Sequence, residues 1–411
     1  MAGLLRLLVP LVLLAAALPA AAQSVVADNV SAEATETASQ PKIARDGRGG
    51  LHLALVVPVR GVDQVFVASS DDNGRSWRLT QVTTRSAPSR YPTLAAGRDG
   101  RLHLAWTTYE PIGHVYYAQR AADNWSAPRK ISPGDAYAGV PAIAVDAWGM
   151  PHLVWYGIRN QAPPVLTRHG SIYEILYSGQ EGSRWTTPIV ISPGIPDSIN
   201  PALAADAAGD VHSAWYQFDI QAYQARYVRR RGGRWGAPEQ VSAGNRDAVA
   251  VALAVHPDGR AYLVWERRGA VPEVYFAERL DRWSGQRAIS PSGQPAAHPA
   301  VAVDTQDRVH VVWESDGRIQ LRRRDRHWQG VETLDAEGTN THPIVAATGE
   351  TIDMMWTQAV GGRHRVRFAT LGPRGGPSLD QRRPAWTAVI LILLAAGLLW
   401  QWRRRGAVIR R

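Results

Sequence analysis

The sequence predicts an all-β fold, a seven-bladed β-propeller of four-stranded blades, followed by one C-terminal transmembrane helix. Three observations lead to this prediction: a phrase that recurs seven times, turn residues inside each copy, and one apolar stretch near the chain end. The fullest copies are Pro141–Trp155 and Pro299–Trp313. A repeat of about 50 residues is typical of a four-stranded propeller blade. The copies open at Pro41, Pro92, Pro141, Pro201, Val251, Pro299 and Pro343, and they close at Leu55, Trp106, Trp155, Trp215, Trp265, Trp313 and Trp356.

The first 22 residues have the features of a secretory signal peptide. Arg6 provides a basic residue, residues 7–18 form an apolar stretch, and Ala20–Ala22 resemble a cleavage site. A retained membrane anchor is the alternative, but the apolar stretch is short for a membrane span. We therefore expect the propeller, at residues 23–370, to be exported from the cytoplasm.

The C-terminal end predicts a membrane anchor. Residues 371–384 are rich in Gly, Pro and Arg and are expected to form a tether. Residues 385–402 are expected to form the transmembrane helix, since no charge occurs between Trp386 and Trp402. The basic residues 403–411 would then lie in the cytoplasm. The alternatives are a buried core helix and a sorting tail that a peptidase removes.

Composition narrows the class of protein. The chain has no cysteine, so an exported domain of this size depends on its core and not on disulfides. Net charge is +10, but several arginines lie in the C-terminal tail and its approach. No basic stripe with interleaved aromatic residues is present, and export argues against a nucleic-acid partner. Lysine occurs only at Lys42 and Lys130, which indicates a GC-rich bacterial genome and a bacterial cell membrane as the location.

Each copy contains the elements of one blade. Its first segment is small and apolar, as expected for the innermost strand near the axis. A turn with Gly or Asp follows, and then a second strand that carries a recurring His and, three positions later, the Trp that closes the copy. A third strand leads to a second recurring Trp and to an outer strand that ends in Ile-Ser or Val-Ser. We expect the Trp residues to pack between blades and the His residues to form structural hydrogen bonds, with no metal or other cofactor. The recurring residues are His52, His103, His152, His212 and His310, and then Trp77, Trp125, Trp185, Trp235, Trp283 and Trp328.

The last copy stops after three strands, near Thr370. Its missing outer strand is expected at Asn29–Ser31, because this segment precedes Pro41 at nearly the spacing that separates Val241–Ser242 from Val251. Such a strand would join the first and last blades and leave no exposed sheet edge.

One turn carries a motif with a known structural role. Ser70, Asp72, Gly74 and Trp77 have the spacing Ser-x-Asp-x-Gly-x-x-Trp. This is the Asp-box of the sialidase-like (BNR-repeat) β-propeller superfamily, which the chain resembles over about residues 28–370, as a membrane-anchored bacterial member. In that superfamily the box ties the turn between the third and fourth strands of a blade. The box lies on the face opposite the sialidase active site, and so implies no catalysis.

The resemblance also implies what a sialidase would require. Sialidases of this superfamily bind the substrate carboxylate with three arginines and use a Tyr nucleophile with a Glu partner. The best match to the first arginine is Arg90, followed by Tyr91 and Pro92. Tyr216 and Glu266 follow the second-strand Trp of neighbouring blades and are the candidates for the Tyr–Glu couple. Known sialidases have six blades, whereas seven are counted here.

Two sets of loops share the face opposite the Asp-box, and we call it the loop face. Loops on a rigid scaffold are where binding residues concentrate. One insertion, residues 156–171, lengthens its copy and is either a binding loop or a solvated segment. The ligand-binding candidates are Arg90, Tyr91, Arg159, Arg168, His169, Arg246 and Glu314; the wider loop sets also include Tyr137, Asn200, His298 and His342.

The leading hypothesis is a membrane-tethered extracytoplasmic propeller, not an enzyme, that binds a glycan or an envelope protein on its loop face. The catalytic alternative is an exo-sialidase-type glycoside hydrolase, which needs Arg246 or Arg365 to converge with Arg90 on one carboxylate. A third hypothesis is a scaffold for envelope assembly. Fold analogy alone does not choose among them, because propellers host many unrelated activities.

Overall fold

The computed structural model describes residues 22–28, 30, 42–122, 124–158, 172–192, 194, 197–335 and 337–372 of the 411. Within these ranges every regular element is a β-strand, and no helix has the length and apolarity needed to cross a bilayer. Most of the predicted signal peptide, the predicted tether beyond Gly372 and the predicted transmembrane helix lie outside the described residues.

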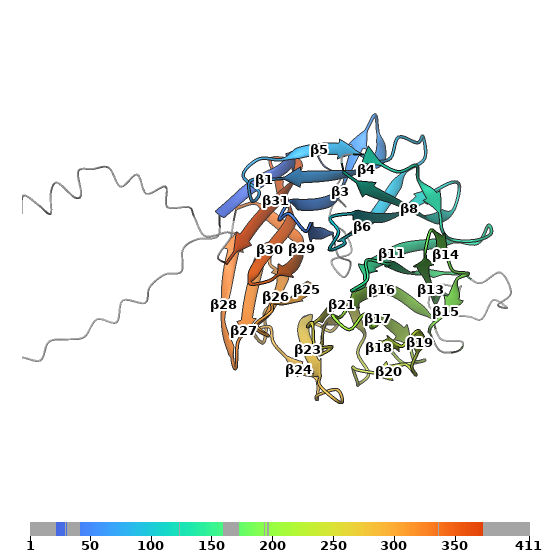
Figure 1. The fold of residues 1–411 in the computed structure, drawn as a ribbon. Helices are drawn as coiled ribbons and strands as arrows, with labels where there is room; N and C mark the ends of the chain where they lie inside the picture. Colours follow the sequence, from blue (N-terminus) through green and yellow to red (C-terminus); the bar gives the residue numbers. More distant parts are fainter. Residues whose placement is uncertain are drawn as a thin grey trace, which may run out of the picture.

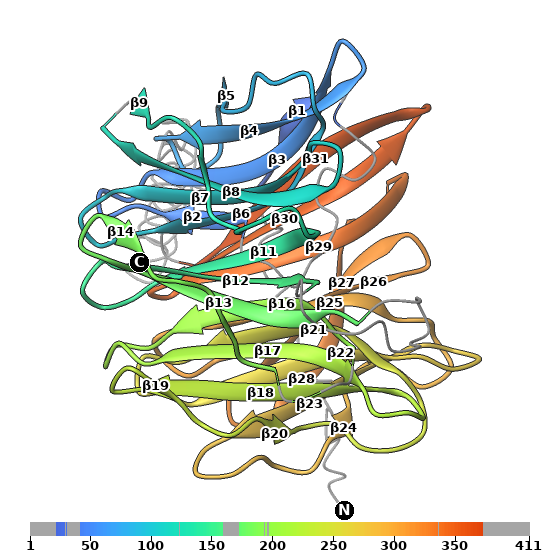
Figure 2. The ribbon, with the colours of Figure 1, turned by 90° about the vertical axis from the view of Figure 1, so that its right-hand side faces the viewer.

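Seven antiparallel sheets form a closed ring, which confirms the predicted seven-bladed propeller (Figure 1). We number the blades 1–7 from the copy that opens at Pro41. The innermost strands surround the axis, and a view turned by 90° shows each sheet lying against the next (Figure 2). The inner strands of blades 1–7 are β2 (Ile43–Arg45), β6 (Ser89–Ala96), β11 (Ala138–Val145), β16 (Ser198–Ala205), β21 (Ala248–Val255), β25 (Ala297–Val303) and β29 (Thr339–Thr348).

The second and third strands of every blade are long, whereas the outer strands are short and vary from blade to blade. The second strands are β3 (Leu51–Val59), β7 (Leu102–Tyr109), β12 (Pro151–Gly157), β17 (Val211–Phe218), β22 (Ala261–Arg267), β26 (Val309–Ser315) and β30 (Thr351–Val360). The third strands are β4 (Val62–Ser70), β8 (Gly113–Ala121), β13 (Glu174–Glu181), β18 (Tyr223–Arg231), β23 (Glu273–Arg279), β27 (Arg318–Arg324) and β31 (Arg363–Leu371).

The outer strands are single in four blades and divided into two short pieces in blades 2–4. They are β5 (Arg78–Gln81) in blade 1, β9 (Asn124–Trp125) and β10 (Arg129–Lys130) in blade 2, β14 (Arg184–Trp185) and β15 (Ile189–Val190) in blade 3, β19 (Arg234–Trp235) and β20 (Glu239–Gln240) in blade 4, β24 (Arg287–Ala288) in blade 5, β28 (Trp328–Asp335) in blade 6 and β1 (Ala22–Asp28) in blade 7.

An N-terminal strand closes blade 7, as the sequence predicts. β1 pairs antiparallel with β31, with Ala22 opposite Thr370 and Asp28 opposite Arg365. The expected position of this strand, residues 29–31, was wrong, because the strand lies at residues 22–28. The buried side chains of Val26 and Ala27 belong to the same core cluster as Val366 and Phe368 of β31. Burial of this apolar segment sets the register, whereas residues 29–31 contain a single apolar side chain.

The recurring Trp residues pack as predicted. The second-strand Trp residues at 106, 155, 215, 265, 313 and 356 are at most 1% exposed. The second set lies between blades: Trp185, Trp235, Trp283 and Trp328 each meet an aromatic ring of the preceding blade edge-on, at centroid distances of 4.9–5.1 Å. Trp77 of blade 1 meets Phe368 of blade 7 at 5.2 Å in the same way. These T-shaped contacts join neighbouring blades around the ring.

The recurring His residues are structural, which confirms the second expectation. Nε2 of His52, His152, His212 and His310 lies 3.2–3.3 Å from a carboxylate oxygen in the preceding turn, namely that of Asp46, Asp146, Asp206 or Asp304. Where Asp353 replaces His, its carboxylate instead binds Arg45 of blade 1 at 2.6 and 2.7 Å, and both side chains are buried. No group of three or more His, Asp or Glu residues suited to a metal ion occurs in the described part of the chain.

The turn with the Asp-box spacing connects β4 to β5 and is held by short hydrogen bonds. The Ser70 hydroxyl donates to Asp72 (2.7 Å) and accepts from the Gly74 N–H (2.8 Å). Asp72 also accepts from the hydroxyl of Ser76, and these hydrogen bonds hold the pKa of Asp72 well below its usual range. Trp77 Nε1 donates to the Gly74 carbonyl at 3.1 Å. The turn therefore anchors Trp77 at the boundary between blades 1 and 7.

Candidate functional site

Every described inner strand except β2 contains a β-bulge at the loop-face end. The ladder register shifts at the same position in β6, β11, β16, β21, β25 and β29. One bulge residue in each strand has a left-handed backbone, with φ of 49–52°. Such φ values are costly for residues other than glycine and persist where the surrounding structure requires them. These bulge residues are Tyr91, Val140, Asn200, Ala250, His298 and His342.

At three of these six bulges, the residue after a second-strand Trp accepts a hydrogen bond from the bulge residue of the following blade. Thr107 Oγ1 accepts the Val140 N–H at 2.9 Å. Glu266 Oε2 lies 3.3 Å from the His298 N–H, and Glu314 Oε2 lies 3.4 Å from the His342 N–H. The bulge itself thus recurs around the axis, with this hydrogen bond at three positions, while the bulge side chain differs from blade to blade. A constant frame with variable side chains is what a recognition site needs.

Tyrosine rings cluster on the blade 3 side of this face. Tyr137, Tyr156 and Tyr173 meet one another with ring centroids 5.2–5.9 Å apart, and the hydroxyls of Tyr137 and Tyr156 are 3.4 Å apart. Tyr109 of blade 2 interacts with Tyr137 through its hydroxyl. All four are half-buried. Burial raises the pKa of each phenol that lies in the cluster, so that all four stay protonated at neutral pH.

Histidine and glutamate gather on the side of blades 6 and 7. Glu314 Oε2 lies 3.1 Å from His298 Nδ1, and the His298 and His342 rings are 4.2 Å apart. Burial alone would lower the pKa of His298, but the hydrogen bond and charge of Glu314 outweigh it and raise that pKa. Burial and the charge of His298 lower the pKa of His342 to about 4. Burial would raise the pKa of Glu314, but the two imidazoles lower it. Of the two imidazoles, His298 therefore keeps a proton to higher pH than His342 does.

The predicted Tyr–Glu couple is not hydrogen-bonded in the structure. Tyr216 of β17 accepts from the Asn200 side chain at 2.7 Å, and burial raises its pKa to about 12. Glu266 of β22 instead lies beside the His298 N–H and 3.6 Å from Arg268. A phenol with so high a pKa has little phenolate at neutral pH, so the arrangement lacks the activation that a nucleophile needs.

The candidate arginines are engaged at different blades. Arg90 donates to Asp63 at 2.8 Å across the boundary between blades 1 and 2, next to Tyr91. Arg365 pairs with Asp28 at 3.2 Å within blade 7. Arg246 precedes β21 and lies near Gly269 in blade 5. Arg159, Arg168 and His169 lie outside the described residues.

The structure therefore brings Tyr91 and Glu314 of the predicted set to the axis end of the loop face. Sequence reasoning placed Tyr137, Asn200, His298 and His342 in the right loop set but did not single them out. In the sequence, Asn200, His298 and His342 directly precede the proline that opens a copy. Tyr137 lies in the segment just ahead of that position. We call the tyrosine cluster and the His298–Glu314–His342 group together the axial site.

No family model matches the chain, and no curated protein matches it in sequence. Among solved structures, a polysaccharide lyase of family PL25, an ulvan lyase, superposes with a TM-score of 0.60 at 11% identity, covering 84% of this chain and 95% of its own. A protein of unknown function from Dyadobacter fermentans gives 0.54 at 12% identity, covering 70% of this chain and 95% of its own. The polysaccharide lyase Uly1 gives 0.53 at 7% identity, covering 79% and 88%. These similarities confirm the propeller fold. Sialidases and an arabinanase are also among the similar structures, at TM-scores of 0.48.

Proposed function

We propose that this propeller binds a glycan at the axial site. The observation that carries the proposal is the pairing of half-buried tyrosine rings with hydrogen-bonding His and Glu side chains around one axis. Aromatic rings offer apolar area to the C–H face of a sugar while their hydroxyls bind its hydroxyl groups. Carboxylates and imidazoles supply further charge-assisted hydrogen bonds. Two structures with the same fold are polysaccharide lyases, and one is bound to a chain of glucuronate and sulfated rhamnose.

The test is calorimetric titration of the purified protein with polysaccharides, first those that contain uronic acid or sulfate. We expect Tyr137→Ala and Tyr173→Ala to weaken binding about tenfold or more, because stacking area is lost at the centre of the contact. The matched control is Trp148→Ala. Trp148 is an aromatic residue that is 70% exposed, in the β11–β12 turn at the opposite end of blade 3. Equal loss in all three variants, or no binding by the parent protein to any glycan, contradicts the proposal.

A second candidate is acid–base cleavage of the bound glycan by the His298–His342 pair. It is favoured by the 4.2 Å approach of the two imidazole rings, whose surroundings move their pKa values in opposite directions, as in sites that separate a general acid from a general base. Release of reducing ends or of unsaturated products from the same polysaccharides would support it. The product should disappear in His342→Gln while binding remains.

The alternative function, which the resemblance to sialidases implies, is sialidase activity. Hydrolysis of a fluorogenic sialoside by the parent protein, lost in Arg90→Ala, would establish it. The ion pair of Arg90 with Asp63 would then have to open for the substrate carboxylate.

We also propose that the propeller is extracytoplasmic and tethered to a bacterial membrane by residues 385–402. The uncharged stretch between Trp386 and Trp402 and the arginines after it support this topology. Fractionation of the full chain beside a chain that ends at residue 384 tests it, because only the first should sediment with membranes. Capture of one stoichiometric envelope protein, independent of glycan, would favour the scaffold function instead.

A further inference from the structure

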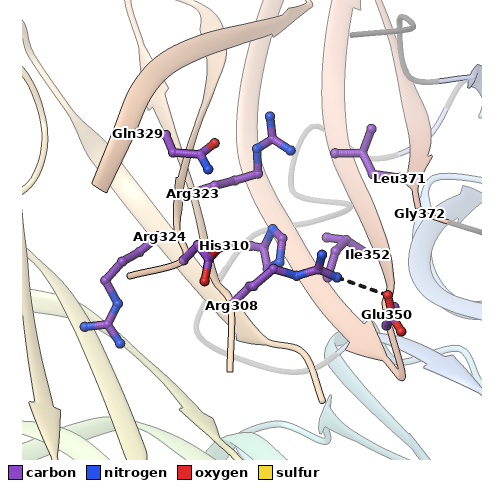
Figure 3. A pocket seen from close by; sticks show the side chains of 10 residues that line it. Arg308, His310, Arg323, Arg324, Gln329, Glu350, Ile352, Leu371 and Gly372 are labelled. Carbon is purple, nitrogen blue, oxygen red and sulfur yellow. Dashed lines mark ion pairs between the residues drawn. The ribbon is translucent and has the colours of Figure 1, made fainter. Parts of the chain in front are cut away.

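A cavity lies between blades 6 and 7, at the end of the propeller opposite the loop face. It measures about 240 Å³ and is lined by residues from β26 and β27 of blade 6, including His310 and Arg323, and by Ile352 and Leu371 of blade 7. Figure 3 shows Arg323 and Gln329 on one side of His310, with Leu371 and Ile352 facing them. Arg308 reaches from blade 6 toward Glu350 at 3.5 Å. We call this the seam cavity, because it adjoins the blade that the two chain ends complete.

The His in the seam cavity lacks a partner that its equivalents have. In blades 2, 3 and 4, Nδ1 of the recurring His lies 2.6–2.7 Å from a third-strand Tyr hydroxyl, that of Tyr117, Tyr177 or Tyr227. Each of these Tyr residues stands two positions before the residue that pairs with the His in the ladder. His310 pairs with Arg323, so the equivalent position is Leu321.

A leucine at this position leaves His310 with one unmet hydrogen bond. His310 is only 5% exposed, and its Nδ1 has no hydrogen-bond partner among the described residues. Its Nε2 lies 3.3 Å from Asp304, a carboxylate that only accepts, so Nε2 carries the proton. In the neutral imidazole of His310, Nδ1 is then a hydrogen-bond acceptor, and a hydroxyl group could donate to it. Leaving a buried hydrogen-bonding atom unsatisfied is unfavourable, and a bound hydroxyl would satisfy it.

Arginine supplies the complementary donors. Arg323 is held by Glu332, yet its Nε is buried without a partner among the described residues. Arg308 binds Asp304 at 2.6 Å and keeps its guanidinium beside the cavity. The lining arginines are thus matched by acidic neighbours, and a free anion gains less here than a group that both donates and accepts. A hydroxyl does both: it donates to His310 Nδ1 and accepts from Arg323.

The equivalent cavity between blades 3 and 4 has the same size class but different chemistry. It measures about 300 Å³ and is lined by His152, Tyr177 and Trp235. There the Tyr177 hydroxyl already meets His152 Nδ1 at 2.7 Å. In the seam cavity that phenol is missing, and the blade 7 side presents aliphatic Ile352 and Leu371. The difference lies in an unfilled hydrogen-bonding position and not in volume.

We propose that the seam cavity binds one hydroxylated ring of monosaccharide size, separately from the axial site. The ring's hydroxyls fill the position of the missing phenol between His310 and Arg323, and its C–H face lies against Ile352 and Leu371. The cavity volume suits a single sugar ring. The propeller would then hold glycan at both ends of its axis, with the two sites on opposite faces.

The test restores the phenol. Leu321→Tyr places at blade 6 the residue that blades 2–4 carry, and should satisfy His310 and occupy the cavity. Ligand-observed NMR on the purified full-length chain, with methyl glucoside, methyl glucuronide and p-cresol as probes, reports occupancy. We expect at least one glycoside to bind in the millimolar range, and its affinity to fall at least tenfold in Leu321→Tyr. The same fall should be seen when Leu321→Tyr is added to Tyr137→Ala, in which the axial site is weakened, and this separates the seam cavity from the axial site.

A second variant and the probe results complete the test of the seam cavity. Arg323→Gln, which removes the guanidinium and leaves Leu321 in place, should also weaken glycoside binding; it serves if Leu321→Tyr does not fold. Binding of p-cresol alone overturns the proposal in favour of a partner protein's tyrosine. Absence of any bound probe, or a glycoside affinity unchanged in both variants, overturns it as well.

Discussion

Gly74→Ala isolates the contribution of the β4–β5 turn to ring closure. Gly74 has φ of +81°, and a Cβ added there would lie 2.4 Å from Cε1 of Phe368, which is 1% exposed. Gly100 has the same φ of +81° in the β6–β7 turn, and an added Cβ there meets nothing within 4 Å. The two glycines therefore impose the same backbone requirement in different surroundings, and Gly100→Ala is the matched control.

The magnitudes follow from these surroundings. A left-handed alanine costs about 1–2 kcal/mol in both variants. At Gly74 the ring of Phe368 or the turn must also move, and overpacking of this kind costs about 1–3 kcal/mol. Movement of the turn would weaken the hydrogen bonds of Gly74 with Ser70 and Trp77. We expect Gly74→Ala to lower the free energy of unfolding by about 2 kcal/mol more than Gly100→Ala does.

The assay is urea unfolding followed by tryptophan fluorescence. A double-mutant cycle with Phe368→Ala supplies the decisive comparison, because removal of the ring should reduce the cost of Gly74→Ala to that of Gly100→Ala. If the two glycine variants lose the same stability, or if the cycle shows no coupling to Phe368, the contact between the turn and blade 7 does not stabilise the closed ring.

Three further predictions concern the core, the axial site and the boundary between blades 7 and 1. Trp265→Ala should cost about 3–5 kcal/mol in urea unfolding, because this side chain is fully buried. Glu314→Gln should lower the pKa of His298 in an NMR titration. Because the folded pKa of His298 lies above its usual 6.5, protonated His298 stabilises the parent fully below the unfolded pKa, and this stabilisation is lost as pH rises through the folded value; the variant should lack this dependence. Arg45→Ala should cost about 3–5 kcal/mol, because it leaves Asp353 buried and unpaired; Arg45→Ala together with Asp353→Ala should restore part of that loss.

The fold was predictable because the repeat encodes each blade locally. The spacing of Trp106 and its equivalents fixes the second strand, and the turns fix the strands on either side. The closing strand was misplaced because its register depends on the burial of Val26 and Ala27 against a partner at the other end of the chain. Local spacing carries no information about such a long-range pairing.

The axial site was only partly predictable. Single positions such as Tyr91 and Glu314 follow from their place in the repeat. Contacts such as the 4.2 Å approach of His298 to His342 join residues that both lie at bulges of their inner strands. Bulges belong to the backbone, and residue patterns of strands do not reveal them. Leu321 can be read from the sequence. That it replaces the tyrosine of blades 2–4 becomes clear only once the ladder pairs His310 with Arg323.

The pairing of β1 with β31 has a consequence for how the protein is made. The first strand of the ring to leave the ribosome finds its partner only when Arg363–Leu371, the last strand, has been synthesised. Until then β1 is a loose edge segment and blade 7 does not exist, so the nascent chain is an open arc with two unprotected ends. Closing the arc joins the extremes of the chain and is therefore expected to be the slow step of folding. Until the arc closes, chains at high local concentration risk exchanging first strands with one another.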